Sequence, residues 1–116
     1  MVIDRYWLST RVYAPTEAMP ALDGLEAQVV PPTLTLFANA PETVRRARLT
    51  GRGGTLTRAD LETLVGRRAE VLTRKYRAWN ASPMVGEFVE LDCSGSANTV
   101  LATALAAVWE AGRRAA

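Results

Sequence analysis

Apolar residues in this 116-residue chain fall into two patterns, compact runs and segments with helical spacing. Compact runs at residues 1–4, 34–38 and 88–92 predict buried strands. Residues 5–14, 22–30, 41–50, 57–79 and 97–113 predict helices, most of which end near proline or glycine. Strands that alternate with helices predict an α/β chain with a parallel sheet, and the length predicts a single domain, residues 1–116.

The segment 57–79 carries several helical signals. Thr57 with Asp60 resembles a capping box, although Asp replaces the usual Glu or Gln. One apolar stripe contains Leu61, Leu64, Val65, Leu72, Tyr76 and Trp79, and the arginines lie mostly off it. Tyr76 and Trp79 are therefore interpreted first as core residues.

Composition narrows the possible chemistry. Apolar residues make up 48% of the chain and charged residues 22%, as in an ordinary globular protein. With no histidine and a single cysteine, Cys93, the chain offers neither an internal disulfide nor a zinc site of the usual kind. No apolar run is long enough to span a bilayer and no signal peptide is evident, so we expect no membrane contact and a cytoplasmic location. A net charge of +2 gives no reason to expect nucleic acid as a partner.

Arginine supplies 13 of the 14 cationic residues, and five arginines crowd into 14 positions: Arg45, Arg46, Arg48, Arg52 and Arg58. The planar guanidinium suits phosphate, and this cluster lies beside glycines at the end of a predicted helix. A solvated helix face is the alternative interpretation, and we apply it to Arg45, Arg46, Arg67 and Arg68.

Four motifs in order resemble one enzyme family. They are Asp4-Arg5-Tyr6 with Ser9 and Tyr13; Leu-Thr-Leu-Phe-Ala-Asn-Ala-Pro-Glu at 34–42; Arg48-x-x-x-Arg52-Gly53; and Val-Glu-Leu-Asp-Cys-Ser at 89–94. Together they resemble thymidylate kinase and its deoxynucleoside-kinase relatives over essentially the whole chain. The resemblance implies a three-layer parallel sheet of P-loop nucleoside/nucleotide kinase type. We expect it to be incomplete, a C-terminal portion without the first strands and phosphate loop, since no Gly-x-x-x-x-Gly-Lys-Ser/Thr precedes these motifs.

By resemblance, five residues belong to the acceptor side. Arg5 would hold the phosphate of the acceptor nucleoside monophosphate through a charge-assisted contact. Asp4 would orient the acceptor or act as the Mg²⁺ ligand, since one carboxylate with phosphate oxygens can suffice. Ser9, Tyr13 and Tyr76 would line the acceptor pocket. The alternative for Asp4 is a helix cap or a partner of Arg5.

The resemblance assigns five further residues to ATP. Arg48 would lie against adenine, and Arg52 would face the ATP phosphates. Arg58 would stabilise charge on the transferring group. Cys93 and Ser94 would border adenine, although a small buried filler is the commoner role for such a cysteine.

Three functions follow as hypotheses. The first is part of an enzyme that transfers the ATP γ-phosphoryl group to a deoxynucleoside monophosphate, with dTMP as the favoured acceptor. We expect the isolated chain to be inactive. The second is a non-catalytic nucleotide-binding or regulatory module derived from the kinase fold. The third is a plain α/β protein with an accidental resemblance. A missing central strand would leave strand edges unpaired, so we expect a homodimer or a separate N-terminal half as partner.

Overall fold

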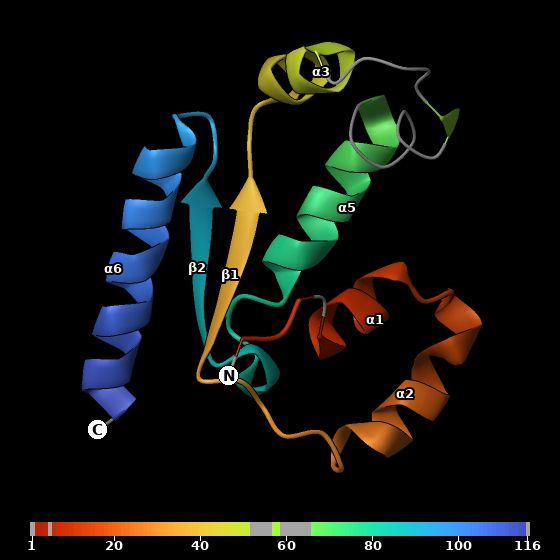
Figure 1. The fold of residues 1–116 in the computed structure, drawn as a ribbon. Coiled ribbons are helices and arrows are strands. Elements are labelled where there is room, and N and C mark those ends of the chain that lie inside the picture. Colours follow the sequence, from red (N-terminus) through yellow and green to blue (C-terminus); the bar gives the residue numbers. More distant parts are fainter. Residues whose placement is uncertain (1, 5, 52–56, 59–65, 116) are drawn as a thin grey trace.

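Two parallel strands form the centre of the protein (Figure 1). The computed structural model describes residues 2–4, 6–51, 57–58 and 66–115. Strand β1 (Leu34–Asn39) pairs with β2 (Glu87–Asp92) in a register that sets Leu34 beside Glu87 and Asn39 beside Asp92. Within these ranges the structure is a mixed α/β arrangement with a two-stranded parallel sheet.

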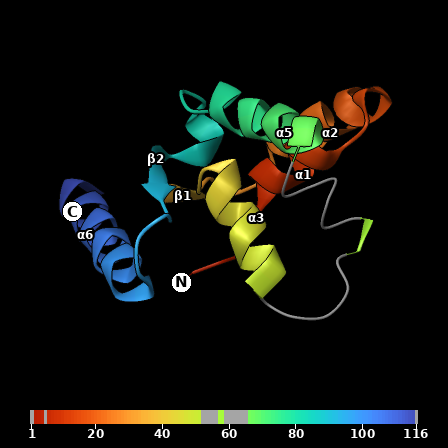
Figure 2. The ribbon, with the colours of Figure 1, turned by 90° about the horizontal axis from the view of Figure 1, so that it is seen from above.

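Helix α6 (Ala97–Ala115) covers one face of the sheet (Figure 2). Its N-terminus is capped by Ser96, whose hydroxyl accepts a hydrogen bond from the Thr99 backbone N–H at 3.2 Å. At the other end, the Arg114 Nε donates to a Glu87 carboxylate oxygen at 3.1 Å. This ion pair raises the pKa of Arg114 and fixes the end of α6 against the start of β2. No helix in the described part of the chain is long and apolar enough to cross a membrane.

Helix α5 (Gly66–Ala78) covers the opposite face, and α1 (Trp7–Tyr13) packs against α5. The Tyr76 ring stacks on Phe37 of β1 with a centroid distance of 4.9 Å. Since side chains alternate along a strand, Phe37 and its neighbour Glu90 face α5, whereas Glu87 and Leu91 face α6. Both faces of the sheet are thus covered, as parallel strands require.

Helix α3 (Glu42–Gly51) begins directly after β1 and is linked to α5 by one carboxylate. Glu42 Oε1 accepts a hydrogen bond from the Gly66 backbone N–H at 2.7 Å and another from Arg46 at 3.0 Å. The Gly66 N–H, and then Arg46, hold the pKa of Glu42 below its ordinary value. A charged acceptor therefore satisfies the first N–H of α5, where the helix dipole favours it.

A buried arginine joins α1 to α2 (Met19–Glu26), which follows a short 3₁₀ turn, η1 (Thr16–Ala18). Arg11 is only 4% exposed. It binds Asp23 at 2.7 Å and Glu26 at 3.1 Å, and its guanidinium lies over Trp7 at 5.5 Å and Trp79 at 5.3 Å. Burial lowers the pKa of Arg11, but hydrogen bonds to Asp23 and Glu26 outweigh burial and the pKa is raised.

The entry to β2 depends on a glycine. After the 3₁₀ turn η2 (Pro83–Val85), Gly86 has a φ of 63°. A Cβ there would lie 2.1 Å from the Pro32 carbonyl oxygen and 2.6 Å from that of Thr33. The absence of a side chain lets the Glu87 N–H reach the Thr33 carbonyl at 3.0 Å, which begins the ladder between β2 and β1.

The structure corrects the expected first strand. Residues 2–4 are not in a strand, and Met1 lies outside the described residues. Val2 is 95% exposed and Ile3 is 52% exposed, so neither is buried. The described run holds only three residues, so pairing it would bury little apolar surface against the conformational entropy lost on ordering it.

Several helix boundaries also differ from the expectation. The segment between the first two expected helices holds η1 and the start of α2, which begins at Met19 and ends at Glu26 rather than spanning 22–30. The single helix expected over 57–79 is interrupted at Gly66, whose φ of 78° does not occur inside an α-helix. Residues 59–65, with three residues of the expected stripe, lie outside the described ranges. The remaining boundaries agree to within about two residues.

We expect Gly86→Ala to destabilise the fold. Gly86 has φ 63° and ψ −141°, a conformation essentially restricted to glycine, so a side chain there costs about 1–3 kcal/mol, and the contact with two backbone carbonyls adds to this. At about 4–8 °C per kcal/mol, the melting temperature should fall by roughly 10 °C or more in a circular-dichroism melt. Gly112→Ala in α6 is the control, because nothing lies within 4 Å of a Cβ there, and it should raise stability by about 0.5–1 kcal/mol. Equal effects of the two changes would contradict this account of Gly86.

We expect Arg11→Met to cost much more stability than Arg46→Met. Arg46 forms an exposed i,i+4 pair, which is worth about 0.5 kcal/mol or less. Arg11 is buried against two indole rings and two carboxylates, and losing one partner of a buried ion pair costs about 3–5 kcal/mol. The cost here should lie below that range, since the Asp23 side chain is 70% exposed. Urea titrations followed by tryptophan fluorescence measure both changes, and similar midpoints would overturn the central role of Arg11.

Candidate functional site

Three residues expected on the acceptor side meet in the structure. The Ser9 hydroxyl on α1 and the Tyr76 hydroxyl on α5 lie 2.9 Å apart, although the residues are 67 positions apart in sequence. The Tyr13 ring stands edge-on to Tyr76 with a centroid distance of 6.4 Å and an interplanar angle of 74°. Helix packing between α1 and α5 therefore creates a cluster of two phenols and a hydroxyl.

The members of this acceptor cluster, Ser9, Tyr13 and Tyr76, differ in exposure. Tyr76 is half-buried between Ser9, Tyr13 and Phe37, in line with the core role considered first for it. Tyr13 is 49% exposed and offers a ring edge and hydroxyl to solvent. Trp79, the other expected core residue, is half-buried beneath Arg11. Tyr13 is thus the member of the cluster that a ligand reaches most directly.

Of the expected carboxylate–arginine corner, the structure describes only Asp4. Asp4 is exposed in a bend, and Arg5 lies outside the described residues. Asp4 does not follow a strand, because residues 2–4 do not join the sheet. Among the residues that the structure describes, no group of three or more Asp, Glu, Cys or His side chains gathers to hold a metal.

Two segments that the resemblance assigns to ATP contact each other in the structure. Arg48 of α3 donates through Nη2 to the Gly95 carbonyl at 3.3 Å, in the loop after β2. In that loop the Ser94 N–H donates to Asp92 Oδ1 at 2.9 Å, and hydrogen bonds from Ser94 hold the pKa of Asp92 below its ordinary value. Cys93 is half-buried, and its thiol donates to the Leu91 carbonyl at 3.5 Å. Arg48 thus contacts the loop after β2.

The remaining expected residues of the ATP side do not add to this contact. Arg52 lies outside the described residues, and Arg58 is exposed on a described helical position. The exposed positions of Arg46, Arg67 and Arg68 agree with the solvated role expected for them. Arg45 corrects that expectation, because it is half-buried and its Nε is buried without a hydrogen-bond partner among the described residues.

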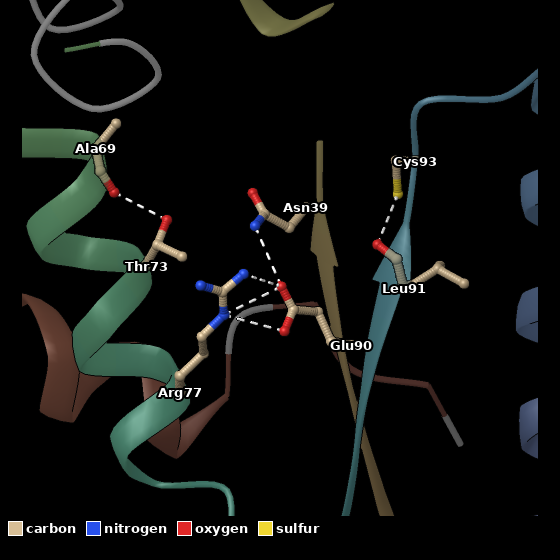
Figure 3. Close-up of polar contacts among 7 residues, drawn as sticks. All are labelled: Asn39, Ala69, Thr73, Arg77, Glu90, Leu91 and Cys93. Carbon is tan, nitrogen blue, oxygen red and sulfur yellow. Dashed lines mark hydrogen bonds and ion pairs between the residues drawn. The ribbon is translucent and has the colours of Figure 1, made fainter. Parts of the chain in front are cut away.

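An open cavity of about 690 Å³ lies at the carboxyl ends of the two strands, between α3 and α5. Its floor is the ion pair of Arg77 and Glu90 (Figure 3). The Arg77 Nε donates to both Glu90 oxygens at 3.0 and 3.2 Å, and Asn39 donates to Oε1 at 3.3 Å. The bond from Arg77, and then that from Asn39, lowers the pKa of Glu90, and the same pair raises the pKa of Arg77. The guanidinium of Arg77 and the carboxylate of Glu90 are therefore both charged near neutral pH, and their hydrogen bonds hold them together.

This cavity was missed by the sequence reasoning, since none of the expected site residues lines it. Its lining has three arginines and three carboxylates, so no single sign of charge dominates: Asn39, Ala40, Pro41, Arg45, Glu70, Thr73, Arg74, Arg77, Glu90, Leu91 and Asp92. One signal was available in the sequence. Asn39 and Asp92 end two strands predicted to be parallel, and such ends meet at the edge where α/β sheets bind ligands.

No protein-family model matches the chain, and neither the curated proteins nor the solved structures yielded a match. What the protein does must therefore be argued from its own motifs and from the geometry of its described residues.

Proposed function

We propose that the chain is the C-terminal part of a thymidylate-kinase-like enzyme. The complete enzyme would transfer the γ-phosphoryl group of ATP to a deoxynucleoside monophosphate, with dTMP as the favoured acceptor. On this proposal the two-stranded sheet belongs to an incomplete three-layer P-loop kinase sheet, and the protein works in the cytoplasm. The convergence of Ser9, Tyr13 and Tyr76 carries the proposal, since Ser9 and Tyr13 come from one motif and Tyr76 from a distant helix, and the resemblance gives all three to one acceptor pocket.

The chemistry of the acceptor cluster suits a nucleoside. Aromatic rings provide stacking surfaces that bases use, and each such contact is worth about 1–3 kcal/mol. The exposed ring of Tyr13 offers this surface, while Ser9 and Tyr76 hold each other by a hydrogen bond behind it. We assign base contact to Tyr13, and orientation of its ring to Tyr76.

A second contact supports the ATP side. The resemblance places Arg48 against adenine and the loop after β2 at its border, and Arg48 contacts Gly95 of that loop at 3.3 Å. A guanidinium fixed by a backbone carbonyl presents a flat cationic face, which favours stacking on an aromatic base. On the proposal, Cys93 and Ser94 border the same base through their backbone.

The phosphate chemistry of the proposal depends on four charged residues, of which the structure describes Asp4 and Arg58, both exposed. ATP would supply the transferred group, and Mg²⁺ would neutralise charge on its phosphates. Asp4 would hold the ion or orient the acceptor, Arg5 the acceptor phosphate, and Arg52 and Arg58 the ATP phosphates. The sequence contains no Gly-x-x-x-x-Gly-Lys-Ser/Thr, the loop that cradles the phosphates in such enzymes. We therefore propose that the isolated chain binds nucleotides weakly and does not turn them over.

We expect no dTMP-dependent release of ADP from ATP by the isolated chain. Positioning and charge stabilisation supply nearly all catalysis of phosphoryl transfer, and the phosphate loop normally supplies much of both. A coupled ADP assay with Mg²⁺ measures the rate, and a complete thymidylate kinase is the positive control. Robust Mg²⁺-dependent turnover by the purified chain would show that the chain is a sufficient enzyme.

Nucleotide titrations test the two sites separately. We expect Tyr13→Ala to weaken dTMP binding by roughly fivefold to a hundredfold through lost stacking, with little change for ATP. Arg48→Ala should weaken ATP binding by about tenfold to a hundredfold, with little change for dTMP. Arg46→Ala, on the same helix but exposed, is the control and should leave both affinities unchanged. NMR chemical-shift titrations read out each ligand.

The outcomes separate the two leading hypotheses. Binding of both nucleotides with selective losses supports the kinase-derived sites. Binding of one nucleotide only would favour the non-catalytic module, and absence of binding to either would sink the proposal.

A further inference from the structure

One edge of β1 has no partner in the described structure. The Thr33 carbonyl accepts from Glu87 N–H at 3.0 Å and the Asn39 carbonyl accepts from Cys93 N–H at 2.8 Å. Backbone groups alternate in direction along a strand, so the odd-numbered residues point their N–H and C=O toward β2. The backbone groups of Leu34, Leu36 and Ala38 therefore point to the opposite edge, where no described strand lies.

The two outer edges of the sheet differ in charge. Strand β2 contains three acidic residues among its six, Glu87, Glu90 and Asp92, and charged edge strands resist pairing with other chains. Strand β1 contains no charged residue in Leu-Thr-Leu-Phe-Ala-Asn. The uncharged edge of β1 is therefore the edge with which another strand can pair.

Helix α6 carries an apolar stripe that the sheet does not cover. Leu101, Leu105, Val108 and Trp109 are 57%, 59%, 50% and 70% exposed. They recur with the spacing of one helix face, and a contiguous apolar face of this kind marks a contact surface. The face of α6 that meets the sheet is a different one, in which Ala111 is 4% exposed. Four large side chains on one described helix thus lack a covering element.

The apolar stripe lies on the flank of α6 nearer to β1. An α-helix turns by about 100° per residue, and Ala104 and Ala111 mark the line on α6 that faces the sheet. Arg114 lies on one side of this line and the apolar stripe lies on the other. Arg114 binds Glu87 of β2, so its side of α6 lies over β2. The apolar stripe, on the other side of α6, is therefore turned toward β1 and its free edge. The unpaired edge and the uncovered stripe are therefore neighbouring parts of one surface.

We propose that two copies of this chain join through that surface around a two-fold axis normal to the sheet. The β1 strands pair antiparallel, with Leu36 opposite Leu36 and Leu34 opposite Ala38, because these residues carry the free backbone groups. The result is a continuous sheet of order β2-β1-β1-β2. Both α6 helices then lie on the same face, and their apolar stripes turn toward each other across the axis.

A second copy fits this surface for three reasons. The edge is self-complementary, since an antiparallel partner presents the same three residues at the same spacing. The net charge of each chain is only +2, so repulsion between copies is weak. The charges at the rim of the stripe are paired within each copy, Arg113 with Glu110 at 3.5 Å. This pairing does not depend on the proposed function, and it leaves only the acid-rich edges of β2 exposed.

The mass in solution tests the dimer. One chain weighs 12.6 kDa, and we expect light scattering behind size exclusion to give twice this value at micromolar concentration. Ala38→Pro removes an N–H of the free edge without removing a bond to β2, and Pro is tolerated at such edge positions. Leu105→Glu places a charge in the stripe. Each change should weaken dimerisation at least tenfold, with helical circular dichroism retained.

The control is Leu25→Glu, the same substitution at a residue of α2 that is 50% exposed and lies away from the surface. It should remain a dimer. A monomeric wild-type chain, a mass well above two chains, or equal dissociation by Leu25→Glu and Leu105→Glu would each overturn the proposal. If Ala38→Pro fails to fold, Leu105→Glu compared with Leu25→Glu still decides it.

Discussion

The parallel pairing of β1 with β2 constrains the rest of the molecule. Parallel strands cannot be joined by a tight turn, so the chain must cross over one face between them. Helices α3 and α5 make this crossover, and α6 then returns over the other face. The backbone bond from Glu87 to Thr33 starts the ladder, and it forms only because Gly86 brings no side chain against the Pro32 and Thr33 carbonyls.

Ion pairs hold the helices in place around this sheet, and these pairs differ in their exposure to solvent. Arg11 is buried between Trp7 and Trp79 and binds the carboxylates of α2, so α1, α2 and the end of the α5 segment share one charged centre. Arg77 with Glu90 joins α5 to β2, and Arg114 joins α6 to β2. These outer pairs are about half exposed and contribute orientation more than stability. The buried pair is the one on which the N-terminal half depends.

The two proposals concern different surfaces of the same layers. The nucleotide sites are proposed where α1 meets α5 and where α3 meets the loop after β2. The dimer surface is proposed along the free edge of β1 and the outer flank of α6. A strand added to that edge from any source competes with the second copy, so the oligomeric state of the chain and its completion as an enzyme would be linked.

The sequence by itself determined most local elements: the β1 and β2 runs, α6 with its Ser96 cap and the end of α3 at Gly51 follow from periodicity and from cap chemistry, which act within a few residues. It also singled out Ser9, Tyr13 and Tyr76, and Arg48 with the loop after β2, by resemblance. Only the tertiary structure decided which residues pair. Residues 2–4 form no strand because so short a run buries too little surface on pairing, and Arg45 is half-buried where α3 borders the cavity beside α5. Burial and pairing depend on partners distant in sequence, and no local pattern records them.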